Sequence, residues 1–258
     1  MKQEHLDLLQ KISGIPGCVS TKEAIFLYEA AKNCKNGVIV ELGSWKGKST
    51  ICLGLGSKNG WGAKVYAVDP HTGSPDQKTY GALNTFEEFK RNIKNAGLEN
   101  IIEPVVMTSF EAVKNWTKPI GLIFVDSNYY DYELTRRDFF EWSRCLASGG
   151  IYALHNDVPS VSGILEGIPL HGWKPVRKFM KDFIFGSGNF KIIKIRGTTA
   201  AIQKSEKITI LDKIKNRLTR IQSALLYLNH KIYMALASLP QPIKNPVKAL
   251  FRQTKRPV

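Results

Sequence analysis

Cysteine is scarce in this sequence, and long apolar runs are missing. The 258 residues include four cysteines and no C-x-x-C pair, so neither a common zinc site nor a disulfide framework is indicated. No stretch approaches the roughly 20 apolar residues of a membrane-spanning helix. The first residues include Glu4 and Asp7 and no apolar run behind a basic segment, which is not typical of a signal peptide. These absences predict a cytoplasmic protein with reduced thiols.

Acidic residues are scarce only toward one end of the chain. The formal net charge is +15. From Ser205 onward, eleven Lys and Arg residues stand against two acids, Glu206 and Asp212, so this stretch holds +9 of the total. The chain is long enough for one full α/β domain with an appendage, but too short for two large domains. We therefore expect a nearly balanced body followed by a basic tail.

Short apolar runs that alternate with helical patterns predict the fold class. Strands are expected at Val38–Leu42, Lys64–Val68, Ile101–Val106, Leu122–Val125 and Ile151–Leu154. Helices are expected from about Ser49 and over Thr85–Asn95, Ser109–Trp116 and Tyr132–Ala147. Apolar runs of this length between helices indicate a parallel sheet that is covered on both faces. The sequence predicts an α/β protein with a Rossmann-like, doubly wound sheet.

The end of the expected sheet differs from its middle. Phe190–Ile195 and Thr198–Gln203 are two strand-like runs, separated only by Arg196-Gly197. A connection this short permits only an antiparallel hairpin. We therefore expect a mostly parallel sheet that closes with a terminal antiparallel hairpin.

The chain is expected to divide into three segments. Residues 1–36 are predicted to be helical, because Ser20 and Glu23 form a capping-box pattern before apolar residues at helical spacing. Residues 37–204 form the α/β domain, and residues 205–258 form a C-terminal helical extension that is basic and amphipathic.

The stretch VIVELGSWKGKST, from Val38 to Thr50, predicts a cofactor site. A buried strand, a glycine turn and a helix start follow one another, and small cofactors bind at the carboxyl end of such a strand. Gly43 and Gly47 are four residues apart, unlike the G-x-G-x-x-G spacing that brings backbone close to a pyrophosphate. A nucleoside with a short amino-acid arm and no phosphate needs less space between the backbone and the ligand. The Glu41 carboxylate can pair with the cationic amino group of such a ligand.

Polar residues also end other strands of the predicted sheet. Asp69 follows the second strand, where an acid accepts hydrogen bonds from ribose hydroxyls in nucleoside-binding sheets. Asp126 follows the fourth strand and His155 follows the fifth. The carboxyl ends of parallel strands share one edge, so these side chains are expected on the same rim as the glycine turn.

Four motifs together carry a family resemblance: ELGSWKGKST, YAVDPHTGSP, VDSNYYDYELTRRDFFEWSRCLASGG and YALHND. In this order they resemble the class I S-adenosylmethionine (SAM) dependent methyltransferases, over roughly residues 20–204, and specifically a bacterial methyltransferase-domain family. The first motif is also similar to catechol-type O-methyltransferases. The resemblance implies SAM as cofactor and a role for each of the following residues. Gly43, Ser44, Gly47 and Ser49 would line the methionine end of SAM, Asp69 the ribose, Thr108 and Ser109 the adenine, and Asp126 and His155 the transferred methyl.

The expected chemistry is an in-line methyl transfer, in which the enzyme aligns the acceptor and removes its proton. His155 is the first candidate base, as a neutral imidazole with a pKa near 6.5, and His71 is the second. The rival is a magnesium ion, for which catechol-type enzymes use an Asp after the fourth strand and an Asp-Asn pair after the fifth. Here Asp126 is present, and His155-Asn156 stands where that pair would be, with Asp157 one step on. His155 stands where catechol-type enzymes carry an aspartate, and magnesium disfavours nitrogen ligands, so the metal assignment stays open.

The tail carries an apolar seam with alternating steps of three and four. Its members are Leu211, Ile214, Leu218, Ile221, Leu225, Leu228, Ile232, Ala235 and Leu239. Three interpretations fit such a helix: docking on the protein's own core, self-association through a coiled coil, and a peripheral contact with an anionic membrane surface. Its few aromatic residues are not interleaved with bases, which argues against nucleic acid.

The sequence therefore predicts a SAM-dependent methyltransferase that acts on oxygen. A hydroxyl of a sugar, glycan precursor or natural product is the expected small-molecule acceptor, on family association alone. The alternative enzyme is a metal-assisted phenolic O-methyltransferase. A non-catalytic SAM-binding protein attached to a membrane by its basic tail is the alternative from another class, because the family's D-G-D-H-S-Y-E segment lacks its histidine here, between Asp126 and Glu133.

Overall fold

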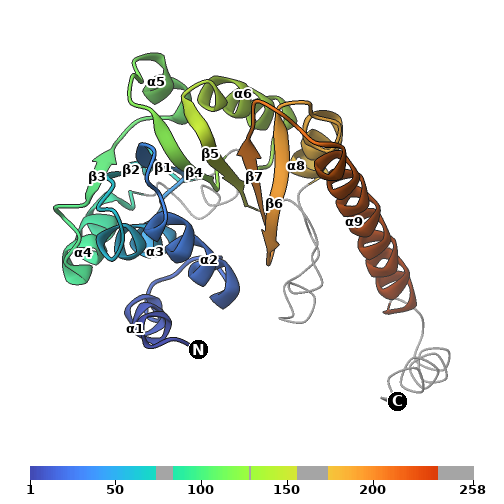
Figure 1. Ribbon diagram of the computed structural model, residues 1–258. Coiled ribbons are helices and arrows are strands. Elements are labelled where there is room, and N and C mark those ends of the chain that lie inside the picture. Colours follow the sequence, from blue (N-terminus) through green and yellow to red (C-terminus); the bar gives the residue numbers. More distant parts are fainter. Residues whose placement is uncertain (74–83, 128, 156–173, 238–258) are drawn as a thin grey trace.

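The computed structural model describes residues 1–73, 84–127, 129–155 and 174–237 (Figure 1). Asn156 and Asp157 lie outside the described residues, as does the basic end of the tail from residue 238.

The described residues form a seven-stranded sheet in the order β3-β2-β1-β4-β5-β7-β6. The strands are β1 Val38–Leu42, β2 Val65–Val68, β3 Ile102–Val105, β4 Ile120–Val125, β5 Leu146–Leu154, β6 Phe190–Arg196 and β7 Thr199–Lys204. Strands β1 to β5 are parallel, whereas β7 is antiparallel to both β5 and β6. This confirms the predicted fold class, a doubly wound parallel sheet with a terminal antiparallel hairpin.

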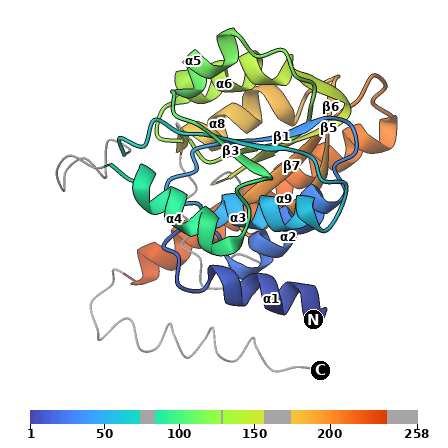
Figure 2. The same cartoon turned by 90° about the vertical axis from the view of Figure 1, so that its left-hand side faces the viewer.

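Helices cover both faces of the sheet, so the body has three layers (Figure 2). The helices are α1 Gln3–Ile12, α2 Thr21–Lys32, α3 Lys48–Lys58, α4 Phe86–Ala96, α5 Ser109–Lys114, α6 Tyr132–Ser143, α8 Lys174–Phe179, the π-helix η2 Met180–Ile184, and α9 Ile210–Ala237. Successive strand residues point to opposite faces. Val40 packs on the side of α5, α6 and α8, while Ile39 packs on the side of α1 to α4. The two cores explain why the central strands β1, β2 and β4 are almost entirely apolar.

Several boundaries differ from the sequence-based predictions, and the clearest differences arise where strands pair. The helix expected over Tyr132–Ala147 ends at Ser143, because Leu146 already pairs with Ile120 of β4. Strand β5 is correspondingly longer, and a register shift in its pairing with β4 contains Gly149, whose φ is +74°. The hairpin turn is Gly197-Thr198 rather than Arg196-Gly197. Helices α8 and η2 were not predicted.

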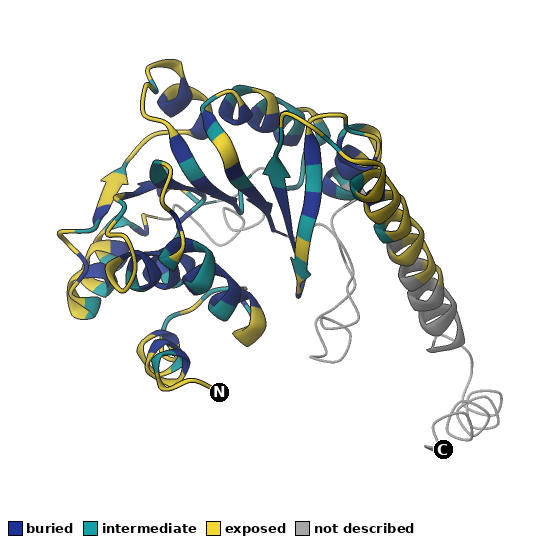
Figure 3. Cartoon of the chain, viewed as in Figure 1, coloured by how far each residue is buried: buried dark blue, intermediate teal, exposed yellow. Residues whose placement is uncertain are grey.

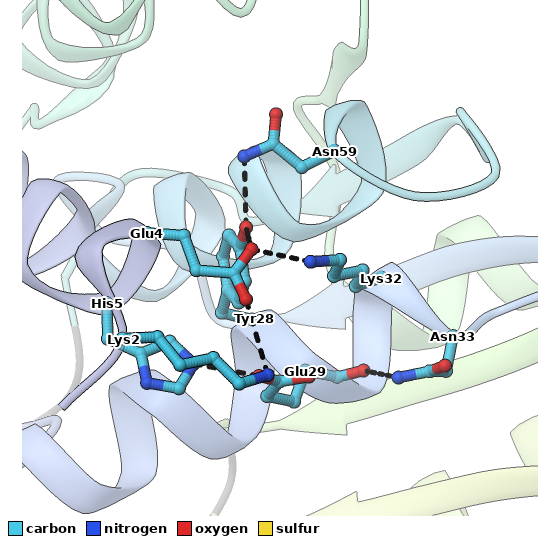
Figure 4. Close-up of polar contacts among 8 residues, drawn as sticks. All are labelled: Lys2, Glu4, His5, Tyr28, Glu29, Lys32, Asn33 and Asn59. Atoms are coloured by element: carbon cyan, nitrogen blue, oxygen red, sulfur yellow. Dashed lines mark hydrogen bonds and ion pairs between the residues drawn. The ribbon is translucent and has the colours of Figure 1, made fainter.

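Helix α1 is fastened to α2 and to the end of α3 by polar contacts (Figure 4). The Tyr28 hydroxyl donates to Glu4 at 2.9 Å and accepts from Asn59 at 3.0 Å. His5 lies 2.8 Å from Glu29. Helix α2 begins with the predicted capping box of Ser20 and Glu23, so the helical character of the first segment is confirmed.

Helix α9 contacts the body at its first turns and extends away from it (Figure 1). Its described seam residues, from Leu211 to Leu228, are exposed (Figure 3). The interpretation that the seam docks on the protein's own core is therefore wrong for these residues. Among the described residues, no helix has the length and apolar character needed to cross a membrane.

Candidate active site

The strand ends that carry the predicted site residues meet at one edge of the sheet. In each case a backbone N–H just beyond one strand donates to the last carbonyl of the neighbouring strand. The bonds join Gly43 to Val68 (2.9 Å), Asp126 to Leu42 (2.8 Å) and His155 to Val125 (2.9 Å). The structure thus brings the glycine turn, both strand-end acids and His155 to a common rim.

The glycine turn has a backbone conformation that side chains oppose. Gly43 has φ +87°, and a Cβ there would lie 2.6 Å from the backbone oxygen of Asp126. Gly47 has φ +90° and precedes the first residue of α3. The N–H groups at the start of α3 have no intrahelical acceptors, so the turn presents donors and a positive dipole end to the rim.

Trp45 and Lys46 form the middle of this turn. Lys46 Nζ lies 2.9 Å from Glu88 of α4, and the Lys46 carbonyl accepts a 2.9 Å hydrogen bond from Asn92. These contacts direct the Lys46 side chain toward α4, away from the sheet edge, and they fix the shape of the loop.

Asp69, at the end of β2, stabilises two segments of the rim through its carboxylate. One carboxylate oxygen accepts from the Trp45 N–H at 2.7 Å, and the other accepts from the His71 N–H at 2.6 Å. The carboxylate therefore ties the glycine turn to the loop that follows β2. Asp69 lies at the strand end as expected, and its contact with a ribose stays a prediction.

Glu41 is fully buried beneath the turn. The Thr50 hydroxyl donates to Oε2, while Oε1 has no hydrogen-bond partner among the described residues, nor has the buried Ser44 Oγ. Burial raises the pKa of Glu41 to about 8, and the neighbouring Ser49 and Thr50 hydroxyls offset this only in part. An unpaired buried oxygen is costly, so these two oxygens fit a cationic ligand group at the turn.

His155 lies between two carboxylates in the interior. Its Nδ1 is 2.8 Å from Asp126 Oδ1 and its Nε2 is 3.4 Å from Glu23 Oε1. Only 1% of the His155 side chain and 1% of the Glu23 side chain are exposed, whereas 20% of the Asp126 side chain is exposed. Asp126 is therefore the member of this triad that can meet a ligand at the rim.

The charge state of His155 differs from the sequence-based expectation of a neutral imidazole. Burial acts to lower its pKa, but the charges and hydrogen bonds of Asp126 and Glu23 outweigh burial and raise the pKa well above 6.5. His155 is then an imidazolium at neutral pH. An imidazolium has no lone pair with which to accept a proton.

Glu23 was predicted only as part of a helix cap, yet it joins three segments of the protein. Its Oε1 accepts from the Thr198 N–H (2.8 Å), the Thr198 hydroxyl (3.1 Å) and the Thr199 hydroxyl (3.0 Å). Its Oε2 accepts from the N–H and the hydroxyl of Ser20. Burial acts to raise its pKa, but His155 and Ser20 together hold the pKa at about 2. The capping pattern accounts for this acid completely, so its sequence neighbours contain no further signal.

Thr108 and Ser109 begin α5 after β3, as predicted, but their side chains have local partners. Thr108 forms a capping box with Glu111. The Ser109 hydroxyl donates to Asp138 of α6 at 2.8 Å in the buried interface. The side chain of Ser109 therefore takes part in helix packing.

His71, the second candidate base, is also buried. Its Nδ1 lies 3.0 Å from the Thr85 hydroxyl, and its ring packs against Phe86 and Phe89. Burial lowers the pKa of His71, although the Asp69 charge opposes this. His71 is therefore the neutral histidine near the rim.

One group of three metal-ligating side chains comes within reach of a single ion in the part of the chain that the structure describes. It consists of Glu4, His5 and Glu29, which belong to the α1–α2 contacts of Figure 4. Both carboxylates already pair with lysines, Glu4 with Lys32 and Glu29 with Lys2. These contacts explain the cluster as a clamp between helices.

Comparison with known protein families gives a match to the central part of the chain. Residues 40–156 match the family model described as a methyltransferase domain. This stretch runs from β1 to just beyond His155 and so contains the whole rim described above.

Solved structures share the fold at low sequence identity. The O-methyltransferase TomG from Streptomyces achromogenes, involved in tomaymycin synthesis and crystallised with SAM, is 17% identical; the match covers 80% of this chain and 91% of TomG, with a TM-score of 0.53. The Podospora anserina methyltransferase PaMTH1, bound to S-adenosylhomocysteine (SAH), is 14% identical over 80% and 89%, with a TM-score of 0.57. An SAH-bound O-methyltransferase from Bacillus cereus is 15% identical over 80% and 92%, with a TM-score of 0.54. The chain therefore shares its fold with these methyltransferase structures, and its residues 40–156 match a methyltransferase domain.

Proposed function

We propose that this protein transfers a methyl group from SAM to a hydroxyl oxygen of a small molecule. The observation that carries the proposal is a pair of buried oxygens at the glycine turn, Glu41 Oε1 and Ser44 Oγ, which have no hydrogen-bond partner among the described residues. The turn lies within the stretch that matches the methyltransferase domain. SAM carries an ammonium group on its amino-acid arm, and this group supplies the hydrogen bonds that the two oxygens lack.

The remaining cofactor contacts follow the rim. Gly43, Ser44, Gly47 and Ser49 hold the methionine end, where the turn and the start of α3 offer N–H donors. Asp69 holds the ribose hydroxyls, which requires its carboxylate to share its oxygens with the Trp45 and His71 N–H groups. The segment of Thr108 and Ser109 borders the adenine through its backbone, since both side chains have partners of their own.

Bound SAM supplies a methyl group that is already activated for displacement. Asp126 is the part of the triad that reaches the rim, and its carboxylate receives the proton of the acceptor hydroxyl. His155 holds Asp126 in place through the 2.8 Å contact. Glu23 in turn holds His155. In this arrangement His155 is a positioning residue rather than the base.

A sugar, glycan precursor or natural product is the proposed acceptor class. TomG, which shares the fold, acts in the synthesis of a natural product, and this supports a hydroxylated small molecule. The metal-assisted phenolic reaction is the competing mechanism, since Asp126 belongs to both. The 2.8 Å contact between Asp126 and His155 favours the metal-free mechanism, because the imidazolium already neutralises the carboxylate.

We also propose the division of the chain into a helical segment (1–36), the methyltransferase domain (37–204) and the basic tail (205–258). The Glu23 contacts with Thr198 and Thr199 mean that the first segment completes the domain and does not fold apart from it.

Calorimetry with SAM and SAH tests the cofactor site. Asp69→Ala is expected to abolish binding, because it removes the ribose acceptor and the brace of the turn. Asp7→Ala, the same change on α1, is the control and should bind like the wild type. Unchanged affinity of Asp69→Ala would contradict the site.

Methyl transfer from labelled SAM to a panel of hydroxylated compounds tests the reaction. Turnover that EDTA removes and magnesium restores would favour the metal mechanism.

A further inference from the structure

Two neighbouring side chains of α9 bond to the backbone of β6: the exposed Lys215, whose Nζ donates to the Ile193 carbonyl at 3.4 Å, and the buried Asn216. Asn216 is 1% exposed. Its Oδ1 accepts from the Ile192 N–H at 3.0 Å, and its Nδ2 donates to the Phe190 carbonyl at 3.1 Å. Both partners belong to β6, the edge strand of the sheet. An edge strand has unpaired backbone groups, and Asn216 satisfies two of them. This contact decides which face of α9 meets the body.

The opposite face of α9 is an apolar stripe in contact with solvent. Its seven large side chains are between 48% and 77% exposed: Ile210, Leu211, Ile214, Leu218, Ile221, Leu225 and Leu228. At 3.6 residues per turn they fall within an arc of about 100°, and Asn216 lies on the other side of the helix axis. The stripe therefore points away from the protein, along the projecting helix seen in Figure 3.

Basic residues flank the stripe on both sides. Lys215 lies beside one edge of the arc and Arg217 beside the other, with Lys213 and Arg220 next to Arg217; all four are exposed. The one acid in the helix, Asp212, accepts hydrogen bonds from the N–H and hydroxyl of Thr209 at the helix start. From residue 213 to the end of the sequence there is no acidic residue.

We propose that α9 docks this protein on an anionic lipid bilayer, with the leucine and isoleucine stripe inserted at the interface and the flanking bases on lipid phosphates. An apolar face with bases beside it is the arrangement that binds such surfaces, and each flanking base adds electrostatic attraction. A second copy of the chain is a poorer occupant. Pairing two such helices would place bases opposite bases, with no free acid to set the pairing.

Vesicle co-sedimentation of the full chain tests the proposal. Two vesicle types are compared: phosphatidylcholine alone, and phosphatidylcholine with about a third phosphatidylglycerol. The protein is expected to bind the second type, and more weakly as salt is raised. Leu218→Ser with Leu225→Ser is expected to lower binding by roughly tenfold or more. Both positions are exposed, so the variant keeps its fold, which thermal unfolding verifies.

Matched control variants test whether vesicle binding depends on the α9 stripe or on exposed apolar residues and net charge in general. Leu6→Ser with Trp61→Ser changes two exposed apolar residues elsewhere and should bind like the wild type. Lys213→Gln with Arg217→Gln should weaken binding, whereas Lys11→Gln with Arg91→Gln removes equal charge outside α9 and should not. Absence of binding to anionic vesicles would overturn the proposal. So would a dimer in sedimentation velocity that the stripe variant converts to a monomer, if vesicle binding is unchanged.

Discussion

Nε2 of His155 lies 3.4 Å from Oε1 of Glu23, in a place where neither side chain meets solvent. Glu23 belongs to the first turn of α2 and His155 follows β5. The contact therefore couples the segment before the sheet to the rim that carries Gly43, Asp69 and Asp126.

We expect Glu23→Gln to lower the free energy of unfolding by about 3 kcal/mol, because it removes one partner of a buried ion pair. Urea denaturation measures the change. Glu29→Gln is the matched control: it lies on the same helix, its side chain is 32% exposed and it pairs with Lys2 and His5. A partly exposed pair contributes about 0–1 kcal/mol to the free energy of unfolding. Equal losses in the two variants would show that the buried contact contributes no more than the exposed one.

The same substitution should also lower the pKa of His155. Glu23 is one of two carboxylates that raise it, so the imidazole should titrate at lower pH in Glu23→Gln than in the wild type. Histidine NMR signals measure this shift directly. A purely structural role of Glu23, without an electrostatic one, would leave the His155 titration where it was.

Stability is expected to fall in acid through Glu23. Its pKa is about 2 in the folded protein, against 4.5 for an ordinary glutamate, so its contribution is present above pH 4.5 and is lost as the pH falls toward 2. The His155 pKa is raised, so the contribution of His155 is complete below pH 6.5 and is lost only as the pH rises through its folded value. The stability difference between the wild type and Glu23→Gln should thus be largest between pH 4.5 and 6.5. A stability difference between the wild type and Glu23→Gln that grows below pH 4.5 would contradict the expected direction of the pH dependence.

Glu41 should make SAH binding depend on pH. The pKa of Glu41 is about 8 in the protein, so the side chain is protonated at pH 6, and pairing with the ligand ammonium requires it to release its proton. Affinity is then expected to rise from pH 6 to 8 by about tenfold per unit at most. Methylthioadenosine, which lacks the amino-acid arm, is the control and should show no such rise. Glu41→Gln should remove the rise for SAH, and a rise that persists in this variant would separate Glu41 from the ligand.

Gly43→Ala should destabilise the protein even without ligand. The substitution places a Cβ 2.6 Å from the Asp126 carbonyl oxygen at a φ of +87°. Gly62 also has a positive φ, +68°, but a Cβ there meets nothing within 4 Å. We expect a loss of about 1–2 kcal/mol for Gly62→Ala from the backbone alone, and a clearly larger loss for Gly43→Ala, measured by thermal unfolding. Similar losses of stability in the two variants would mean that the backbone around Asp126 shifts to accommodate the added methyl group.

Local patterns in the sequence determined the fold and the rim. Apolar runs between helical periodicities predicted β1 to β5, and the short connection after Ile195 predicted the antiparallel hairpin. The rim followed because the carboxyl ends of parallel strands share one edge, which places Gly43, Asp69 and Asp126 together without any knowledge of packing. The boundary errors at Ser143 and Gly197 arose where strand pairing, not local propensity, ends an element.

The tertiary structure alone decided the charges at the site and the orientation of the tail. Glu23 and His155 are far apart in the sequence and meet only when the chain folds. No local spacing pattern therefore predicts the pair. The pKa values of Glu41 and His155 depend on burial and on which charges surround them, and neither quantity is a property of the residue's own neighbours in sequence. The apolar seam of α9 was visible in the sequence, but only the contact of Asn216 with β6 determined that the seam faces solvent.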